Sequence, residues 1–134
     1  MLLPIHFLPY FVCLVLFASI DFLWLFTTNQ MYKKYLMHLL GANVNWMGVL
    51  LFYPLYAMGI YLFVVKPFGQ QSSLMNLFLQ GAFFGVVTYG TYDLTNYATL
   101  KEWPAVLVVI DVLWGAFLTG LVSIATVSIL KWIS

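Results

Sequence analysis

Residues 104–132 read PAVLVVIDVLWGAFLTGLVSIATVSILKW, and Asp111 and Lys131 are the only charged side chains among them. An apolar helix of about 20 residues is long enough to cross the hydrocarbon core of a bilayer. This run exceeds that length, which predicts a membrane-spanning helix. Pro104 is well suited to the first helical position, because a proline there loses no hydrogen bond.

The composition extends this prediction to the whole chain. Of its 134 residues 64% are hydrophobic, the mean hydropathy is +1.00, and 7% of the residues are charged, against roughly a quarter in soluble domains. A water-soluble fold of this size has no interior large enough for so much apolar surface. In lipid, backbone polar groups must be paired internally, and long apolar runs without short alternating segments favour helices over a barrel.

The fold class that we predict is all-α, a polytopic membrane protein with four transmembrane helices. Lys66, Pro67 and Gly69 are typical of the end of the second helix. Tight loops after the second and third helices make consecutive helices antiparallel neighbours. Residues 1–134 then form a single four-helix transmembrane domain, whose helices cover about residues 5–28, 46–65, 74–98 and 104–132.

A shorter segment between the first two helices has helical spacing but mixed polarity. Lys33 and Lys34 lie between apolar and aromatic residues that recur every three or four positions, at Tyr32, Tyr35, Leu36, Leu39 and Leu40. Aromatic rings and lysine stems suit the depth of the lipid headgroups. We therefore predict a short interfacial helix over about residues 30–40, ended by Gly41.

The lysines distinguish the two membrane faces by a small margin. With four crossings, one side carries three lysines, Lys33, Lys34 and Lys101. The other side carries two, Lys66 and Lys131. The side with three lysines is favoured as cytoplasmic, which places both termini outside. A margin of one lysine leaves insertion in both orientations open.

A five-residue motif occurs twice in the chain. Residues 20–24 read IDFLW and residues 110–114 read IDVLW, so both fit I-D-x-L-W. Asp and Trp three positions apart share one face of a helix. Because the two helices run in opposite directions, Asp21 and Asp111 should lie at similar depth below one membrane face, roughly 7–11 Å inside the helix ends. Asp93 should lie in the same layer, near the end of the third helix.

These three carboxyls are the centre of a candidate binding site. Helical spacing places phenol and amide groups on one stripe around Asp93, and each of the other two acids has a tryptophan beside it. Three carboxylates close together in a low dielectric cannot all be ionised, so we expect a bound proton, a bound cation or hydrogen bonds from Tyr, Trp and Asn donors. The candidate ligand-binding residues are Asp21, Trp24, Tyr89, Asp93, Asn96, Tyr97, Asp111 and Trp114.

The same residue types also suit structural roles. Carboxyls near the headgroups can cap or connect helices, and Trp and Tyr commonly form an aromatic belt at the membrane interface. Gly81 and Gly85 on the third helix, with Ala116 and Gly120 on the fourth, have the spacing of closely packed helices. No His or Cys lies at ligand spacing with the acids, so we expect no metal. We find no cofactor motif, and therefore expect no cofactor.

A longer pattern resembles a known family. The resemblance lies in four segments. They are the run from Gly81 to Gly85, TYGTYDLTNYATL at residues 88–100, WP at 103–104 and DVLWG at 111–115. They are similar to a family of small bacterial membrane proteins, domain-of-unknown-function family 2177. The resemblance covers essentially the whole chain and implies a four-helix protein of the bacterial inner membrane, without implying an activity. The residues that match its motif positions are Asp21, Asp93, Asn96, Asp111 and Trp114.

Three functions are compatible with the sequence. We favour binding of a lipid or other amphiphile, with modification of it left open, the head lying at the acids and the tail in the apolar half of the bundle. The alternatives are a small cation- or proton-coupled transporter, although carrier sites tend to lie nearer the midplane, and a structural membrane subunit. No nucleophile constellation indicates an enzyme. The expected partners are membrane lipids, with a homo-oligomer left open, and the lack of Arg argues against nucleic acid.

Overall fold

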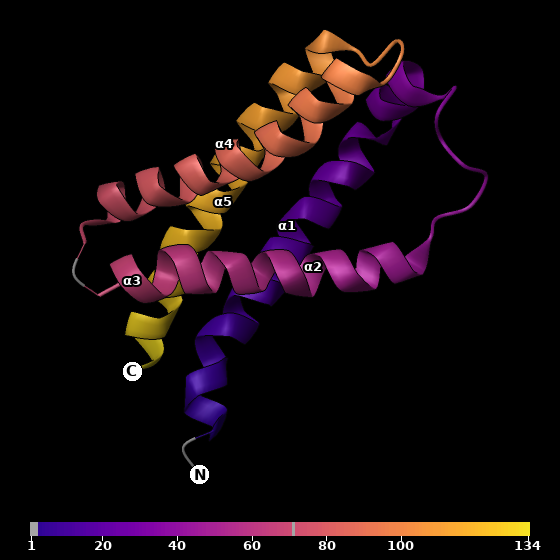
Figure 1. Ribbon diagram of the computed structural model, residues 1–134. Coiled ribbons are helices and arrows are strands. Elements are labelled where there is room, and N and C mark those ends of the chain that lie inside the picture. Colours follow the sequence, from indigo (N-terminus) through magenta and orange to yellow (C-terminus); the bar gives the residue numbers. More distant parts are fainter. Residues whose placement is uncertain (1–2, 71) are drawn as a thin grey trace.

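The part of the chain that the structure describes folds into three long helices and a fourth helical stretch of three parts (Figure 1). The computed structural model describes residues 3–70 and 72–134, with side chains from Phe7 onward. The long helices are α1 (Leu3–Leu36), α4 (Leu74–Thr99) and α5 (Ala105–Ile133). The fourth stretch joins α2 (Trp46–Ile60), the π-helix η1 (Tyr61–Val65) and α3 (Lys66–Phe68). Figure 1 shows α4 and α5 side by side from their connecting loop onward before the C-terminal part of α5 diverges, while α2 crosses the bundle obliquely.

Three of these helical stretches are long and apolar enough to cross a membrane, namely residues Phe7–Leu36, Trp46–Phe68 and Ala105–Ile133. The fourth helix, α4, is not among them, because its Thr, Tyr, Asn and Gly residues lower its hydropathy. The predicted all-α fold is confirmed for the described residues. A membrane crossing by α4 stays a prediction.

The first helix continues past residue 28, where we expected it to end. It runs to Leu36, and the N–H groups of Leu39 and Leu40 then close a turn on the carbonyl of Leu36. The prediction of a separate interfacial helix over residues 30–40 is therefore wrong. No glycine or proline lies between Thr28 and Leu36 to interrupt the backbone, so the apolar helix continues through the more polar segment.

The second helical stretch also continues past its expected end at residue 65. Within η1 the N–H of Lys66 donates to the carbonyl of Tyr61, five residues earlier instead of four. A proline ring clashes with the carbonyl four residues before it in an α-helix. The wider turn directly ahead of Pro67 accommodates that ring, and the helix then reaches Phe68 before Gly69 ends it.

The closest helix contact in the fold joins α4 to α5 through their small residues. A Cβ atom added to Gly81 would lie 2.8 Å from the carbonyl oxygen of Thr119 and 3.0 Å from the Cα of Gly120. A Cβ added to Gly85 would lie 2.9 Å from the Cα of Ala116. The close packing predicted from the small-residue spacing is confirmed.

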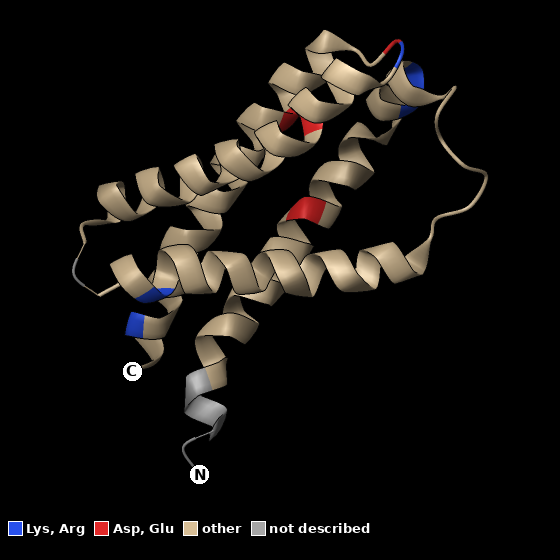
Figure 2. Cartoon of the chain, in the orientation of Figure 1, with Lys and Arg blue, Asp and Glu red and all other residues tan. Residues whose placement is uncertain are grey.

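The lysines gather at opposite ends of the bundle, as Figure 2 shows. The end of α1 and the α4–α5 loop carry one group, while α3 and the end of α5 carry the other. In the α4–α5 loop, Glu102 has a left-handed backbone conformation (φ 59°). Pro104 is the N-cap residue, so α5 begins at Ala105, one position later than expected.

Candidate binding site

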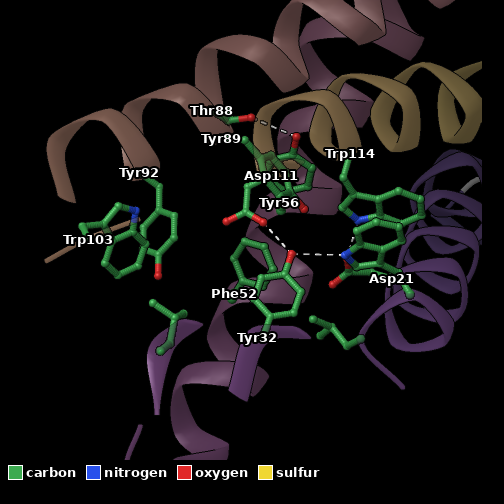
Figure 3. Close-up of a pocket in the computed structure, with 13 residues that line it drawn as sticks. Asp21, Tyr32, Phe52, Tyr56, Thr88, Tyr89, Tyr92, Trp103, Asp111 and Trp114 are labelled. Carbon is green, nitrogen blue, oxygen red and sulfur yellow. Dashed lines mark hydrogen bonds between the residues drawn. The ribbon is translucent and has the colours of Figure 1, made fainter. Parts of the chain in front are cut away.

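A cavity of about 440 Å³ lies among α1, α2, α4 and α5, and we call it the acidic cavity (Figure 3). Its volume is within the range of protein pockets for small ligands. Five of the eight predicted site residues line it, namely Asp21, Trp24, Tyr89, Asp111 and Trp114. Residues from the first, third and fourth predicted helices therefore converge on one space.

Asp21 on α1 is buried, with 6% of its surface exposed, and both of its oxygens are hydrogen-bonded. The Tyr53 hydroxyl from α2 donates to Oδ2 at 2.5 Å, and the Trp114 indole N–H from α5 donates to Oδ1 at 3.1 Å. Asp21 thereby connects three helices.

Asp111 on α5 is 8% exposed and has one hydrogen-bond donor among the described residues (Figure 3). The hydroxyl of Tyr32, from the last turns of α1, donates to its Oδ1 at 2.5 Å. The same hydroxyl oxygen accepts a hydrogen bond from the indole N–H of Trp24 at 3.3 Å. A carboxyl, a phenol and an indole thus form one chain across the cavity wall.

The two copies of the I-D-x-L-W motif are linked reciprocally. The tryptophan of the second copy donates directly to Asp21, and the tryptophan of the first reaches Asp111 through Tyr32. The rings of Trp24 and Trp114 also stack on each other, with centroids 4.2 Å apart and planes 8° apart. The repeat in the sequence therefore corresponds to a contact between α1 and α5.

Asp93 on α4 is fully buried but does not line the acidic cavity. Neither of its side-chain oxygens has a hydrogen-bond partner among the described residues, and the same holds for the indole N–H of Trp103, which does line the cavity. Figure 2 shows acidic positions side by side on α4 and α5. Asp93 and Asp111 interact electrostatically and are therefore neighbours, but only Asp111 lines the cavity.

The three acids lie at different distances from the ends of their helices, and their common depth below one membrane face stays a prediction. Asp93 lies six residues before the end of α4 and Asp111 six residues after the start of α5, about 9 Å from those ends. Asp21 lies fifteen residues before the end of α1, or about 22 Å, because α1 continues to Leu36. Asp21 is thus near the middle of its helix, while the other two acids are nearer one end of theirs.

The remaining predicted residues differ in their position. The ring of Tyr89 lines the cavity and meets the Tyr56 ring edge-on, with centroids 5.9 Å apart. Asn96 and Tyr97 do not line the cavity, and Tyr97 is 54% exposed on the outer side of α4. Asn96 and Tyr97 were predicted because they follow Asp93 at helical spacing. The face of α4 that meets the cavity carries Thr88, Tyr89 and Tyr92 instead.

One comparison identifies relatives of the chain. A family model described as a predicted membrane protein (DUF2177) matches residues 6–128. The chain belongs to this family. No curated protein and no solved structure matched it. The resemblance expected from the sequence is confirmed, and the family description adds no activity.

Several cavity residues of this family member were not among the predicted site residues. They are mainly aromatic and come from α1, α2, α4 and the α4–α5 loop, namely Tyr32, Phe52, Tyr56, Tyr92 and Trp103. Tyr32 belongs to the segment that we assigned to the interface, and its hydroxyl reaches Asp111 only because α1 continues. A signal for Phe52 and Tyr56 was present in the dense aromatic run FYPLY at residues 52–56 on α2.

The lining of the acidic cavity has a definite chemical character. Its charged residues are the two carboxyls, and no Lys, Arg or His lines it. Tyr and Trp rings form much of the remaining wall, and their faces attract cations. No three His, Cys, Asp or Glu side chains of the described residues are grouped as metal ligands. The arrangement therefore suits an organic cation with an apolar part.

Proposed function

We propose that this protein binds an amphiphile with a positively charged head group in the acidic cavity. The observation that carries the proposal is a 440 Å³ space that holds Asp21 and Asp111, is walled by aromatic rings and has no lining cation. The carboxyls would meet the head group, and the apolar part would lie against the rings. Amine-bearing lipids have this chemistry.

Charge balance supports a cationic head group. Asp21 and Asp111 accept their hydrogen bonds from neutral phenol and indole donors. Such donors stabilise a carboxylate but do not neutralise it, and an uncompensated charge is costly in a low-dielectric site. A bound ammonium group would supply the missing charge and would also interact with the ring faces, each such contact being worth about 0.5–2 kcal/mol.

The rim of the cavity supports an apolar tail. Leu25 on α1 and Phe52 on α2 both line the cavity and are exposed at the surface of the bundle. In a membrane this surface faces hydrocarbon, so a tail leaving the cavity there would remain in an apolar environment. The cavity would thus open toward lipid instead of toward water.

The proposal includes four membrane crossings in a bacterial inner membrane. The 26 residues of α4 extend about 39 Å, enough to cross the bilayer. This helix lies along α5 (Figure 1), which is one of the apolar candidates. Its polar side chains would face the bundle or the headgroups. The bacterial inner membrane is the location that the resemblance noted in the sequence implies.

Transport of a small cation is the second candidate, and the depth of Asp21 favours it. Carrier sites tend to lie near the membrane midplane, and Asp21 lies near the middle of α1. Asp21, Asp111 and Asp93 would then form a series of acceptors at different depths. Amphiphile binding remains preferred because the cavity is wide, aromatic and open at an apolar rim.

The test compares two probes with the same tail. Dodecylamine, which is cationic at neutral pH, and neutral dodecanol are added below their micellar concentrations to protein purified in a neutral detergent, and thermal unfolding is followed. Dodecylamine at a hundredfold excess over its Kd should stabilise the protein by about 2.7 kcal/mol. Asp111→Asn should lose this stabilisation, while Glu102→Gln, which removes an exposed loop acid outside the cavity, should keep it.

Two results would contradict the proposal. Equal stabilisation by dodecanol would mean that only the apolar wall is recognised. Equal loss in Glu102→Gln would mean that the amine responds to net charge alone. An assay in liposomes distinguishes binding from transport. Uptake of a small amine, or release of protons, would favour the carrier if it is lost when Asp21 is substituted.

A further inference from the structure

A second cavity lies at the opposite end of the bundle, and it is basic. Its volume is about 610 Å³, and Lys66 on α3 and Lys131 near the end of α5 both line it. Figure 2 shows basic positions on these two helices close to each other at that end. We call this space the basic cavity.

The π-helix positions one of these lysines. An α-helix advances about 100° around its axis per residue, so the additional residue accommodated in the turn Tyr61–Val65 shifts every later side chain by about that angle. Tyr61 and Val65 line the basic cavity together with Lys66. The irregular turn and the lysine thus belong to the same wall, and without the π-turn Lys66 would point to a different side of the stretch.

The rest of the basic cavity combines an apolar wall with a polar amide. Val127, Leu130 and Ile133 line it from α5, and Leu8 and Pro9 line it from α1. Gln70 is a further polar residue of the lining. A ligand that fits this lining has a polar anionic part and an apolar part.

No acidic side chain of the described residues lines the basic cavity beside the two lysines. The four acids of the chain are Asp21, Asp93, Glu102 and Asp111, and none of them lines the basic cavity. Two like charges in one apolar-walled cavity repel each other, and an anion placed between them removes that repulsion. Lysine ammonium groups are common ligands of phosphate.

We propose that the basic cavity binds the phosphate-bearing head group of an anionic membrane lipid, with an acyl chain along its apolar wall. This site is separate from the acidic cavity and does not depend on its proposed function. A free phosphate shares the charge but cannot use the apolar wall, so the lipid should bind more tightly.

The experiment measures binding of dioleoyl phosphatidylglycerol by native mass spectrometry and thermal shift. The double variant Lys66→Gln/Lys131→Gln should weaken this binding roughly tenfold or more, since hydrogen bonds to charged groups are among the stronger ones. The matched control Lys33→Gln/Lys34→Gln removes the same charge at the other end and should leave binding unchanged. Lys66→Arg/Lys131→Arg keeps both charges and should retain most of the affinity.

The remaining arms separate the sources of the anion. Zwitterionic dioleoyl phosphatidylcholine and inorganic phosphate should each stabilise the wild type less than phosphatidylglycerol does. Equal weakening in the control variant would overturn the proposal, because attraction would then follow net charge. Equal stabilisation by inorganic phosphate would overturn the lipid assignment. If the double Gln variant does not fold, Lys131→Gln alone, at an exposed position in the last turn of α5, should show a smaller loss in the same direction, and no loss there would count against the site.

Discussion

A single methyl group at Gly85 should separate α4 from α5. A Cβ atom at this position would lie 2.6 Å from the carbonyl carbon of Gly115 and 2.9 Å from the Cα of Ala116, and closer still to the carbonyl oxygen of Gly115. These atoms belong to the backbone of α5 and cannot rotate away. To bring the carbonyl carbon of Gly115 alone to an ordinary contact of 3.4 Å, the two helices must move apart by about 0.8 Å at this point, and the closer carbonyl oxygen requires a larger separation. Overpacking of this kind costs about 1–3 kcal/mol.

The measurement is reversible unfolding by SDS in mixed micelles, followed by tryptophan fluorescence. Gly90→Ala is the matched control on the same helix, because a Cβ there meets only Leu94 Cδ1, at 3.9 Å. Alanine is the better helix former, by about 0.5–1 kcal/mol, so Gly90→Ala should be neutral or stabilising. Gly85→Ala should unfold at lower SDS than both the wild type and the control. If the two variants unfold together, Gly85 does not set the distance between the helices.

Three further predictions concern the acids and the orientation. Asp93→Asn should raise the unfolding free energy by about 0.5–2 kcal/mol in a thermal melt. The reason is that it removes a buried carboxyl without a donor among the described residues. A lowered unfolding free energy would show that Asp93 stabilises the fold. Trp114→Phe should lower the unfolding free energy by about 1–3 kcal/mol, because Asp21 loses the indole N–H donor. An unchanged melting temperature would refute this stabilising role of Trp114. Single cysteines at positions 34 and 66, in a background without the native cysteine, should react with an impermeant reagent from opposite sides of the membrane. Labelling of both from one side would exclude the proposed four crossings.

The extent of each helix shows what the sequence predicts well. Long apolar runs decide that a helix forms, and α4 and α5 begin and end within one or two residues of the predicted positions. The ends of α1 and of the second helical stretch were predicted too early, because polar residues were interpreted as helix ends. Lys33 and Lys34 made the last turns of α1 look interfacial, but a polar residue does not break a helix. Pro67 was expected to end its helix, and the π-turn admits it instead.

The candidate site was predictable only where residues repeat along one helix. The I-D-x-L-W motif marked Asp21 and Asp111 because a carboxyl is conspicuous in an apolar run. The donors Tyr32 and Tyr53 were not predicted, since an aromatic residue in a membrane helix is most often a packing or belt residue. Their role depends on how α1 and α2 cross, which the spacing within one helix does not encode. Tyr97 does not line the cavity, and this position too depends on how the helices pack against one another.

The hydrogen bonds of the three acids bear on whether the acids are structural or functional. A carboxyl at the centre of a membrane helix costs about 2.5–3.5 kcal/mol on insertion scales, and donors offset that cost. Asp21 accepts two hydrogen bonds, Asp111 accepts one, and Asp93 has none among the described residues. A purely structural set would be expected to have its donors at every member, because an unpaired buried acceptor lowers stability. The decrease from Asp21 to Asp93 therefore gives the largest structural share to Asp21, which connects three helices. It favours Asp111, which lines the cavity with a single donor, as the acid on which a bound cation acts most strongly.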